Sequence, residues 1–447
     1  MTNLQLRKYS FSALILLSFL VCRIVLAQEI QQRCGIEQKM ALLRSQNPVF
    51  YFKQKLFQSE VTRQILLEKS SQSQRKSAET ARELIEIPVV VHVITDSDLR
   101  TLGGVNNSNI SDAQIRAQIR ILNEDFSNAT NTRGFNLNGI DTKLRFKLAT
   151  TDPDQKPTSG IVRVRTTRTG FVPFNDGIAL AQLSGWSSER YLNIWVCRFN
   201  GQSILGVGQY PVGTNIQGLE TETGDAITDG VLVDFRYFGQ SADIRSRLYK
   251  YGRTTTHEIG HWLGLLHTWG DEFCGDDYCA DTPTCEDSNN TSDTTCRDVF
   301  STCRAGIRTR NMTENYMDYT PDRCMNRFTA DQTDRIWKVL DLSPRRSRLI
   351  KYLRNLNIPK TDGLTIDLSS NPVTAAEFDL KVQFKADFQD FEILIFNQAG
   401  RLCYNQNVKQ SPSSITTIPT GSLPPGLYFL KVITSSESAS KRLFILK

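Results

Sequence analysis

The chain has 447 residues, which is longer than one ordinary domain, and its 39% hydrophobic and 22% charged residues exclude a largely disordered protein. The net charge of +6 is spread along the whole sequence. A basic run at Arg345, Arg346 and Arg348 has no aromatic residues between its charges. We therefore expect a solvated surface there and no nucleic-acid binding.

The N-terminus predicts export. Arg7 and Lys8 precede an apolar stretch, residues 11–22, and small residues follow up to Ala27. The stretch is shorter than the roughly 20 residues that cross a bilayer, and Arg23 interrupts it. We expect a signal peptide over residues 1–27, no transmembrane segment, and a protein that is secreted or held at the cell surface after passing through the periplasm.

The next elements follow in chain order. Residues 28–84 are rich in polar and charged residues and predict a helical propeptide, with a protease-accessible linker at 70–77. A strand that is apolar on both faces, residues 87–94, begins a catalytic domain expected over 85–345. Within it the pattern predicts a helix after Ser111 and Asp112, strands at 144–149, 191–197 and 230–234, and a last helix at 330–340.

The C-terminal part has a different texture. Short alternating strands, among them residues 391–396 and 427–432, are separated by turn residues over 365–447. This spacing is typical of a small all-β sandwich. The fold class that follows is α+β, with a sheet-and-helix catalytic domain before the sandwich.

Loss of the signal peptide removes Cys22 and leaves nine of the ten cysteines. Six of them fall between Cys274 and Cys324, and such a cluster in an exported protein indicates disulfides, although the sequence does not choose their pairing. Cys34, Cys197 and Cys403 remain, and Cys197 lies in an apolar strand, which predicts a buried thiol.

Residues 257–267 read H-E-x-x-H-x-x-G-x-x-H. His257 and His261 share one helix face and can bind one metal ion. Gly264 permits a left-handed turn that brings His267 to the same ion. Three neutral nitrogen ligands leave a position open for water, which is typical of catalytic zinc, and Glu258 beside them can act as the general base.

An ordinary amphipathic helix can carry H-E-x-x-H by chance. Here, however, three of the four histidines in the chain fall within this motif. The fourth, His92, lies in the first core strand, and we expect it to be structural. The motif therefore predicts a zinc site.

Residues 314–319, E-N-Y-M-D-Y, resemble the Met-turn of metzincins, in which Met317 would form an apolar floor under the metal. Within that clan the chain resembles the pappalysin family, especially its bacterial members, over about residues 85–340. The matching residues are the histidine motif with Trp262, Asp281-Thr282-Pro283, residues 315–319, Cys324-Met325 and Phe328-Thr329. The resemblance implies a metzincin-type catalytic domain with an irregular, disulfide-bearing lower subdomain, and a zinc endopeptidase acting on proteins or peptides.

The resemblance also implies finer features of the site. Tyr319 would approach the zinc and steady the oxyanion. Residues 204–210 would form an edge strand that pairs with extended substrate. The family's preference for a basic residue after the scissile bond needs an acid in the pocket wall, and the neighbouring Asp322 and Arg323 leave the sign of that pocket open.

The resemblance further suggests calcium, with oxygen donors from Asp276, Asp277, Asp281 and Thr282. A solvated acidic loop is an equal alternative for these residues. Calcium is therefore an expectation beside zinc.

Residues 365–447 resemble the sorting domain of proteins exported by the type IX secretion system. Ser370-Asn371-Pro372, residues 426–432 and residues 441–447 carry that resemblance. It implies the secretion machinery as a partner. A substrate-binding β-sandwich is the alternative.

Cys34 lies near the start of the expected propeptide. A thiolate is a strong zinc ligand and can occupy the position that water needs, as in metzincins with a cysteine switch. The chain would then be made as a latent zymogen, activated by cleavage between about residues 54 and 83. A disulfide from Cys34 to Cys197 or Cys403 is the alternative.

Two other functions stay open at this point. An adhesion protein with an inactive metalloprotease fold would be expected to lack Glu258 or a histidine, and all are present. A zinc hydrolase acting on something other than peptides is disfavoured by the Met-turn.

Overall fold

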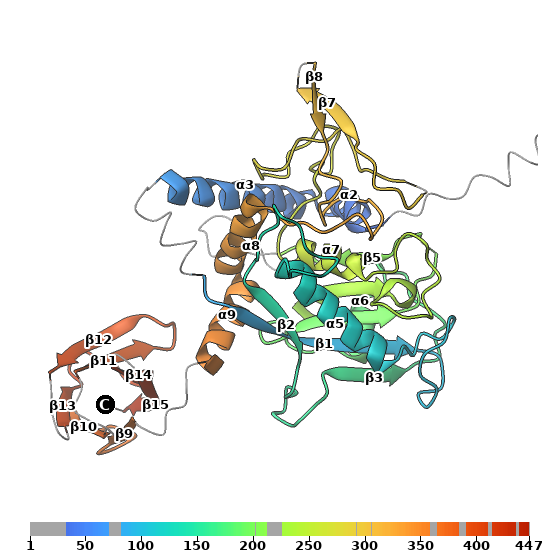
Figure 1. Ribbon diagram of the computed structural model, residues 1–447. Helices are drawn as coiled ribbons and strands as arrows, with labels where there is room; N and C mark the ends of the chain where they lie inside the picture. Colours follow the sequence, from blue (N-terminus) through green and yellow to red (C-terminus); the bar gives the residue numbers. More distant parts are fainter. Residues whose placement is uncertain are drawn as a thin grey trace, which may run out of the picture. The chain divides into compact units, whose positions relative to one another are not determined.

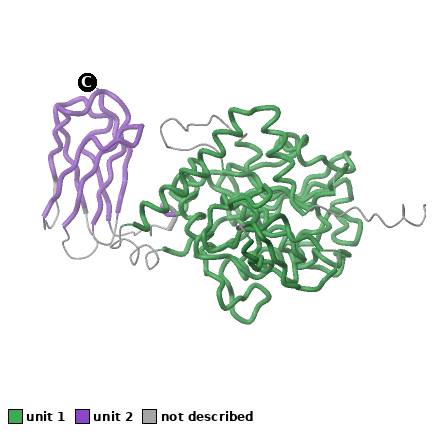
Figure 2. The backbone as a smooth tube through the Cα atoms, turned by 90° about the horizontal axis from the view of Figure 1, so that it is seen from above, with its two compact units in different colours: residues 1–353 green, residues 354–447 purple. Residues whose placement is uncertain are grey.

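The computed structural model describes residues 33–70, 82–201, 203–211, 226–291, 293–304, 306–357, 364–383, 390–409, 414–434 and 438–446. The signal peptide expected over 1–27 and most of the linker expected at 70–77 lie outside these residues. The chain forms two compact units, residues 1–353 and 354–447 (Figure 2). Among the described helices, none is long and apolar enough to cross a membrane.

The first unit is built on a twisted sheet of six strands. β1 (Ile85–Thr95) pairs in parallel with β2 (Leu144–Leu148) along its first half and with β3 (Ile161–Arg165) along its second. On its other side lie β4 (Leu192–Cys197) and β6 (Gly230–Asp234), also parallel. β5 (Gly206–Gly208) runs antiparallel to β6 and ends the strand order at that edge. β1 and β4 are almost entirely buried, as their apolar sequences predict.

Helices cover the sheet (Figure 1). α5 (Asp112–Phe126) begins where the Ser111 hydroxyl accepts a hydrogen bond from the Gln114 amide, and its Ile115 and Leu122 enter the main core. α7 (Arg253–Trp262) carries the first two histidines of the motif. α8 (Ala330–Leu342) begins with a capping box of Thr329 and Gln332. Shorter elements are α6 (Gly177–Leu183), η1 (Ala226–Thr228) and η2 (Phe235–Tyr237).

The segment expected to be a propeptide is helical, as predicted. It forms α2 (Ile36–Gln46) and α3 (Pro48–Ser70). α3 packs along α8, where Phe57 and Val61 are buried against Val339 (Figure 1). The segment is therefore part of the first unit's packed structure.

The basic run near residue 345 differs from the expectation. Arg345 and Arg346, at the start of α9 (Pro344–Asn357), are buried and both donate hydrogen bonds to the carboxylate of Asp229. The Arg346 guanidinium also lies 3.8 Å from the ring centre of Trp262. The prediction of a solvated surface is wrong for these two residues, because Asp229 and Trp262 provide a buried partner for each charge. Arg348 is half-exposed and pairs with Glu189.

The cysteine cluster contains two disulfides, Cys274–Cys303 and Cys296–Cys324. The first of them ends on the hairpin of β7 (Phe300–Arg304) and β8 (Ile307–Arg310). Cys279 and Cys285 are buried free thiols, so the expectation that all six cysteines pair is wrong for these two. Cys285 lies in an apolar cluster and donates to the Pro283 carbonyl instead. Of the remaining cysteines, Cys34, Cys197 and Cys403 are also free.

The second unit is the all-β sandwich that the sequence predicts. One sheet has the order β13 (Ser414–Pro419), β10 (Glu377–Gln383), β9 (Thr365–Leu368), and the other has β12 (Leu402–Val408), β11 (Phe391–Asn397), β14 (Gly426–Thr434), β15 (Ser438–Ile445). Neighbouring strands in both sheets are antiparallel. Alternate residues such as Leu380, Ile393 and Leu430 form a core of its own.

Candidate active site

The three histidines of the motif meet at one point in the interior. The Nε2 atoms of His257, His261 and His267 lie 3.0 to 3.2 Å from one another, and all three rings are buried. His257 and His261 come from one face of α7. His267 reaches them because Gly264 turns the chain at φ +92°.

Each ring is fixed through its other nitrogen. Nδ1 of His257 lies 2.7 Å from the Tyr316 carbonyl oxygen, and Nδ1 of His261 lies 2.8 Å from that of Leu265. Nδ1 of His267 is hydrogen-bonded to the Asp271 carboxylate. Carbonyl and carboxylate oxygens only accept, so the three Nδ1 atoms carry the hydrogens and the three Nε2 lone pairs face one another.

Three lone pairs at this separation repel unless a cation lies between them, so the donor set fits a bound metal ion. Burial lowers the pKa of His261 to about 3, and burial with the two neighbouring rings lowers the pKa of His257 well below its usual value. Both rings are therefore neutral, as ligands must be. Three imidazole nitrogens with a carboxylate behind one of them are typical of a catalytic zinc site.

Glu258 lies beside the histidines and is completely buried. Its Oε2 accepts a hydrogen bond of 2.7 Å from the Gly208 amide and lies 3.3 Å from the Cys34 sulfur. Its Oε1 has no hydrogen-bond partner among the described residues. Burial raises the pKa of Glu258 to about 7, which suits a group that takes and returns a proton near neutral pH.

Two glycines bring the edge strand against this carboxylate. A Cβ at Gly208 would lie 2.4 Å from the backbone oxygen of Glu258, and one at Gly206 would lie 2.8 Å from its Cγ. Any side chain at these positions would push β5 away from α7. The expected edge strand, residues 204–210, is thus in place, although regular pairing covers only Gly206–Gly208.

Met317 lies directly under the active-site helix. Its sulfur would be 2.4 Å from a Cβ at Gly260, which stands between the two histidines of α7. Met317 is fully buried in the main core. This position is compatible with the floor under the metal that the resemblance to metzincins implies, and that role of Met317 stays a prediction.

Tyr319 packs against the same group of rings. Its ring centre is 5.8 Å from that of His257 and 4.9 Å from that of His267. Its hydroxyl donates a hydrogen bond of 3.2 Å to the Cys34 carbonyl oxygen. The Tyr319 hydroxyl is thus placed to donate to a carbonyl group that lies beside the histidine rings.

The segment expected to be a propeptide crosses the site at residues 33–35. The Leu205 amide donates to the Arg33 carbonyl at 3.1 Å and the Gly35 amide donates to the Gly206 carbonyl at 3.0 Å, so the segment extends β5 as a parallel partner. The Cys34 sulfur and one nitrogen of each of the three histidines all lie within 4.8 Å of one another. Burial, followed by the Glu258 carboxylate, raises the pKa of the Cys34 thiol in the absence of a cation.

The Arg33 side chain enters a pocket behind the Met-turn. It forms an ion pair of 3.0 Å with Asp322 and donates at 2.8 Å to the Thr320 carbonyl, and all of Arg33 is buried. Its guanidinium lies 5.2 Å from the ring centre of Tyr249. Asp322 is buried and Arg323 is exposed, so the charge in this pocket is negative.

The residues expected to bind calcium are engaged with protein groups. Asp281 accepts hydrogen bonds from the Thr329 hydroxyl and the Asp331 amide at the start of α8. The Thr282 hydroxyl donates to Asp277, and Asp276 accepts from the Tyr278 amide. Calcium at these residues stays a prediction.

Two contributions to the site escaped the sequence analysis. Asp271 fixes the third histidine, and its position four residues after His267 is the only signal for it. Burial alone would raise the pKa of Asp271, but His267 lowers it below the usual value. The Gly208 amide holds the carboxylate of Glu258. The sequence signal for this glycine was the Gly-Val-Gly of residues 206–208 in an otherwise apolar segment. His92, in contrast, is structural as expected, since Ser184 and Asn193 bind its two nitrogens.

Comparisons with known proteins agree with this geometry. Residues 180–341 match the family described as pregnancy-associated plasma protein-A, the M43 peptidases, and residues 359–446 match the secretion system C-terminal sorting domain. A promirolysin mutant from Tannerella forsythia is 33% identical, with a TM-score of 0.57, over 72% of this chain and 99% of that one. Mature mirolysin in complex with a cleaved peptide is 35% identical, with a TM-score of 0.51, over 62% and 100%.

The chain belongs to the pappalysin family of metallopeptidases. An extracellular metalloprotease of Verticillium alfalfae is 29% identical over 58% of this chain and 76% of its own length. One from Arthroderma benhamiae is 28% identical over 55% and 76%. With its C-terminal sorting domain, this pappalysin is secreted or held at the cell surface.

Proposed function

We propose that the chain is the latent form of a zinc endopeptidase. His257, His261 and His267 would hold the zinc ion, Glu258 would be the general base, and Cys34 would block the site until the propeptide is removed. The observation that carries the proposal is that three unprotonated Nε2 atoms and the Cys34 sulfur converge on one buried point, with the Glu258 carboxylate 3.3 Å from that sulfur.

Zinc, when bound, supplies Lewis-acid chemistry that polarises the scissile carbonyl and makes a water molecule more acidic. Glu258 then takes a proton from the attacking water and passes it to the leaving amine. The Gly208 amide holds one oxygen of this carboxylate and leaves Oε1 free to work. The Tyr319 hydroxyl donates to the substrate carbonyl oxygen as negative charge develops there.

Latency follows from the position of the propeptide. Cys34 stands where the water and the scissile bond would otherwise lie, and its own carbonyl already takes the Tyr319 hydroxyl. A dication among the histidines would favour the thiolate of Cys34 over the thiol. A similar chain, promirolysin, is named as a proenzyme, which supports the same arrangement here.

Arg33 supports a preference for basic residues in the substrate. The propeptide places this side chain on Asp322, in a pocket that also offers the Thr320 carbonyl and the Tyr249 ring. Once Arg33 leaves, Asp322 is a buried carboxylate without its cation, and an arginine or lysine of the substrate would replace it. We assign this pocket to the residue that follows the scissile bond.

The partners that we propose are protein substrates and the type IX secretion machinery. The sorting-domain match supports a secretion system in general, and residues 370–372, 426–432 and 441–447 support this particular one.

The test separates the base from the ligands. The mature Glu258→Ala protein should keep its zinc, because Glu258 is not a ligand, while cleavage of peptides falls by about 100-fold or more. His267→Ala should instead lose zinc, and a chelator should abolish cleavage by the wild type. Metal analysis measures the zinc content of each protein, and digestion of a peptide library measures its cleavage activity. Near-native turnover by Glu258→Ala would remove it from the mechanism, and unchanged zinc in His267→Ala would exclude the third ligand.

A further inference from the structure

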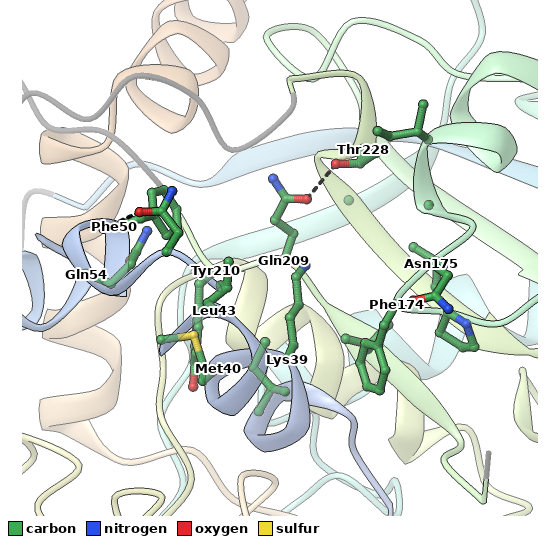
Figure 3. Close-up of a pocket in the computed structure, with 18 residues that line it drawn as sticks. Lys39, Met40, Leu43, Phe50, Gln54, Phe174, Asn175, Gln209, Tyr210 and Thr228 are labelled. Atoms are coloured by element: carbon green, nitrogen blue, oxygen red, sulfur yellow. Dashed lines mark hydrogen bonds between the residues drawn. The ribbon is translucent and has the colours of Figure 1, made fainter. Parts of the chain in front are cut away.

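A cavity of about 330 Å³ lies between the propeptide and the floor of the cleft (Figure 3). Figure 3 shows Lys39, Met40 and Leu43 of α2 on one side of it, with Phe174 and Gln209 facing them. α2 belongs to the part that activation would remove. Of the described residues, those of the catalytic part that line the cavity come from β5 and the two residues after it, from η1 and β6, from the start of α6 and from the loop before it.

The cavity lies on the other side of Cys34 from the Asp322 pocket. Cys34 pairs in parallel with Gly206, and the backbone groups of Arg33 and Gly35 on either side of it bond Leu205 and Gly206, so the propeptide runs in the same direction as β5. Ile36 comes next and lines the cavity, as do Val207 and Tyr210 further along the edge strand. A substrate that places a basic residue on Asp322 would therefore bring residues from the other side of the scissile bond to this cavity.

The described residues that would remain in the wall after activation are uncharged and include a large apolar surface. Phe174, Ile178, Val207 and Leu232 supply its apolar surface. Thr228 donates to Gln209 at 3.0 Å at one end. Lys39, on α2, is the one charged side chain among the described lining residues, and it leaves with the propeptide. A charged substrate side chain placed here would lose part of its water and meet no opposite charge among the described lining residues.

The propeptide itself shows what this wall accepts. Ile36 is buried in an apolar cluster with Val207, Leu232 and Tyr210, and Met40 and Phe174 pack against that cluster. Ile36 stands two residues from Cys34, at the distance of a subsite near the scissile bond. Because the cavity exists with Ile36 in place, the vacated site holds a larger side chain than isoleucine.

We propose that this cavity is a substrate subsite for a large apolar side chain, such as leucine, methionine or phenylalanine, one to three residues before the scissile bond. The inference rests on the proposed function and adds a second specificity determinant to the Asp322 pocket. Phe174 and Ile178 are its specificity-determining residues. Selection is then for an apolar residue on one side of the cut and a basic one on the other.

The test uses the mature protein and peptides that keep one arginine after the cleaved bond. Leucine, phenylalanine, aspartate or lysine is placed at each of the three preceding positions in turn. At one position kcat/KM for leucine or phenylalanine should exceed that for aspartate by about tenfold or more. Affinity of the same peptides for the Glu258→Ala protein, measured by fluorescence anisotropy, should follow the same order, because the subsite acts by binding.

Variants assign the effect to the cavity. Phe174→Ala should reduce the preference for phenylalanine, and Ile178→Glu should weaken leucine peptides while improving lysine peptides by electrostatic attraction. Leu183→Glu is the matched control, since Leu183 lies on the same helix, is similarly exposed and does not line the cavity. It should leave the preference unchanged.

The outcomes separate the two proposals. Cleavage before arginine with equal rates for all preceding residues would overturn the subsite and leave the proposed function intact. An apolar preference that Phe174→Ala and Ile178→Glu both leave unchanged would place the determinant elsewhere and also overturn it. Failure of the wild type to cleave any peptide would instead count against the proposed function.

Discussion

Cys34 is the residue on which latency would depend in the function that we propose. Its thiol lies within reach of the three histidines and 3.3 Å from Glu258, and Tyr319 binds its carbonyl. Neither Cys197 nor Cys403 is paired with it, because all three are free thiols. The sulfur is therefore available as a ligand.

We predict that Cys34→Ala gives a zymogen that activates early. The helices of the propeptide would still dock, but water would enter the position that the sulfur blocks. Full-length Cys34→Ala should cleave a reporter peptide at least about tenfold faster than the full-length wild type, or should process itself during purification. Cys403→Ala, which removes a free thiol in the second unit, is the control. A Cys34→Ala protein as latent as the wild type would show that sulfur does not maintain latency.

His92 is a residue whose effect is on stability and not on catalysis. It is buried between Ser184 and Asn193 and stacked on Trp195. None of these three residues is charged. Burial lowers its pKa from 6.5 to about 4. Between these two pH values the unfolded chain binds the proton that the folded chain refuses, so the contribution of His92 to stability is present above pH 6.5 and is lost as the pH falls toward 4.

We predict that His92→Gln weakens this dependence on pH. Glutamine keeps hydrogen-bonding groups near Ser184 and Asn193 but does not titrate. Both forms are compared in the inactive Glu258→Ala background by urea denaturation. From pH 6.5 to pH 4, the protein that keeps His92 should lose about 3 kcal/mol more of its free energy of unfolding than the His92→Gln variant. Parallel pH curves for the two proteins would contradict the assignment.

At the scale of elements, sequence periodicity predicted the long buried strand β1, the helices α5 and α8, and the sandwich. These elements have clear apolar faces or caps, as at Ser111 and Thr329. β3 and α9 were not predicted. β3 is a five-residue strand with two arginines, and its pairing depends on the second half of β1. α9 is held by Asp229, more than a hundred residues earlier.

The same contrast holds in the site. The three histidines and Glu258 lie within eleven residues, so helix geometry and one glycine turn are enough to predict that they meet. Gly208 and the ion pair of Arg33 with Asp322 depend on contacts between distant segments, and Asp271 reaches His267 through the local turn that follows the motif. The sequence left the sign of the Asp322 pocket open because the burial of Asp322 and the exposure of Arg323 come only from the fold.

The edge strand gives a prediction at this scale. Gly208→Ala places a Cβ 2.4 Å from a backbone oxygen of α7, so the strand must move away from Glu258. We expect kcat/KM of the mature protein to fall by about 100-fold, since a displacement of about 1 Å is enough for that, while zinc content is unchanged. Gly421→Ala, where no atom lies within 4 Å of the new Cβ, should have no effect. Full activity of Gly208→Ala would show that the strand position is not critical.

At the scale of the whole molecule, the chain combines parts with separate cores. The helix α3 of the proposed propeptide buries Phe57 and Val61 on α8, and Arg335 of α8 bonds both Gln58 of α3 and the carbonyl of Gly264, at the turn before His267. The docking of the propeptide and the geometry of the site thus share one buried arginine. The sandwich, in contrast, has its own core and forms a separate compact unit.

This separation predicts the effect of removing the sandwich. A protein that ends before residue 365 keeps α9 and both buried arginines on Asp229, and so it should fold, with a thermal midpoint for its catalytic unit within a few degrees of that in the full chain. Its activity after removal of the propeptide should equal that of the full-length enzyme.

In a host with a type IX system, however, the truncated protein should accumulate in the periplasm, which cell fractionation and immunoblotting would detect. The Glu258→Ala full-length protein is the control, because it lacks activity but should still reach the surface or the medium. Normal export of the truncated protein would mean that residues 365–447 do not sort it, and would favour a role for the sandwich in binding substrate.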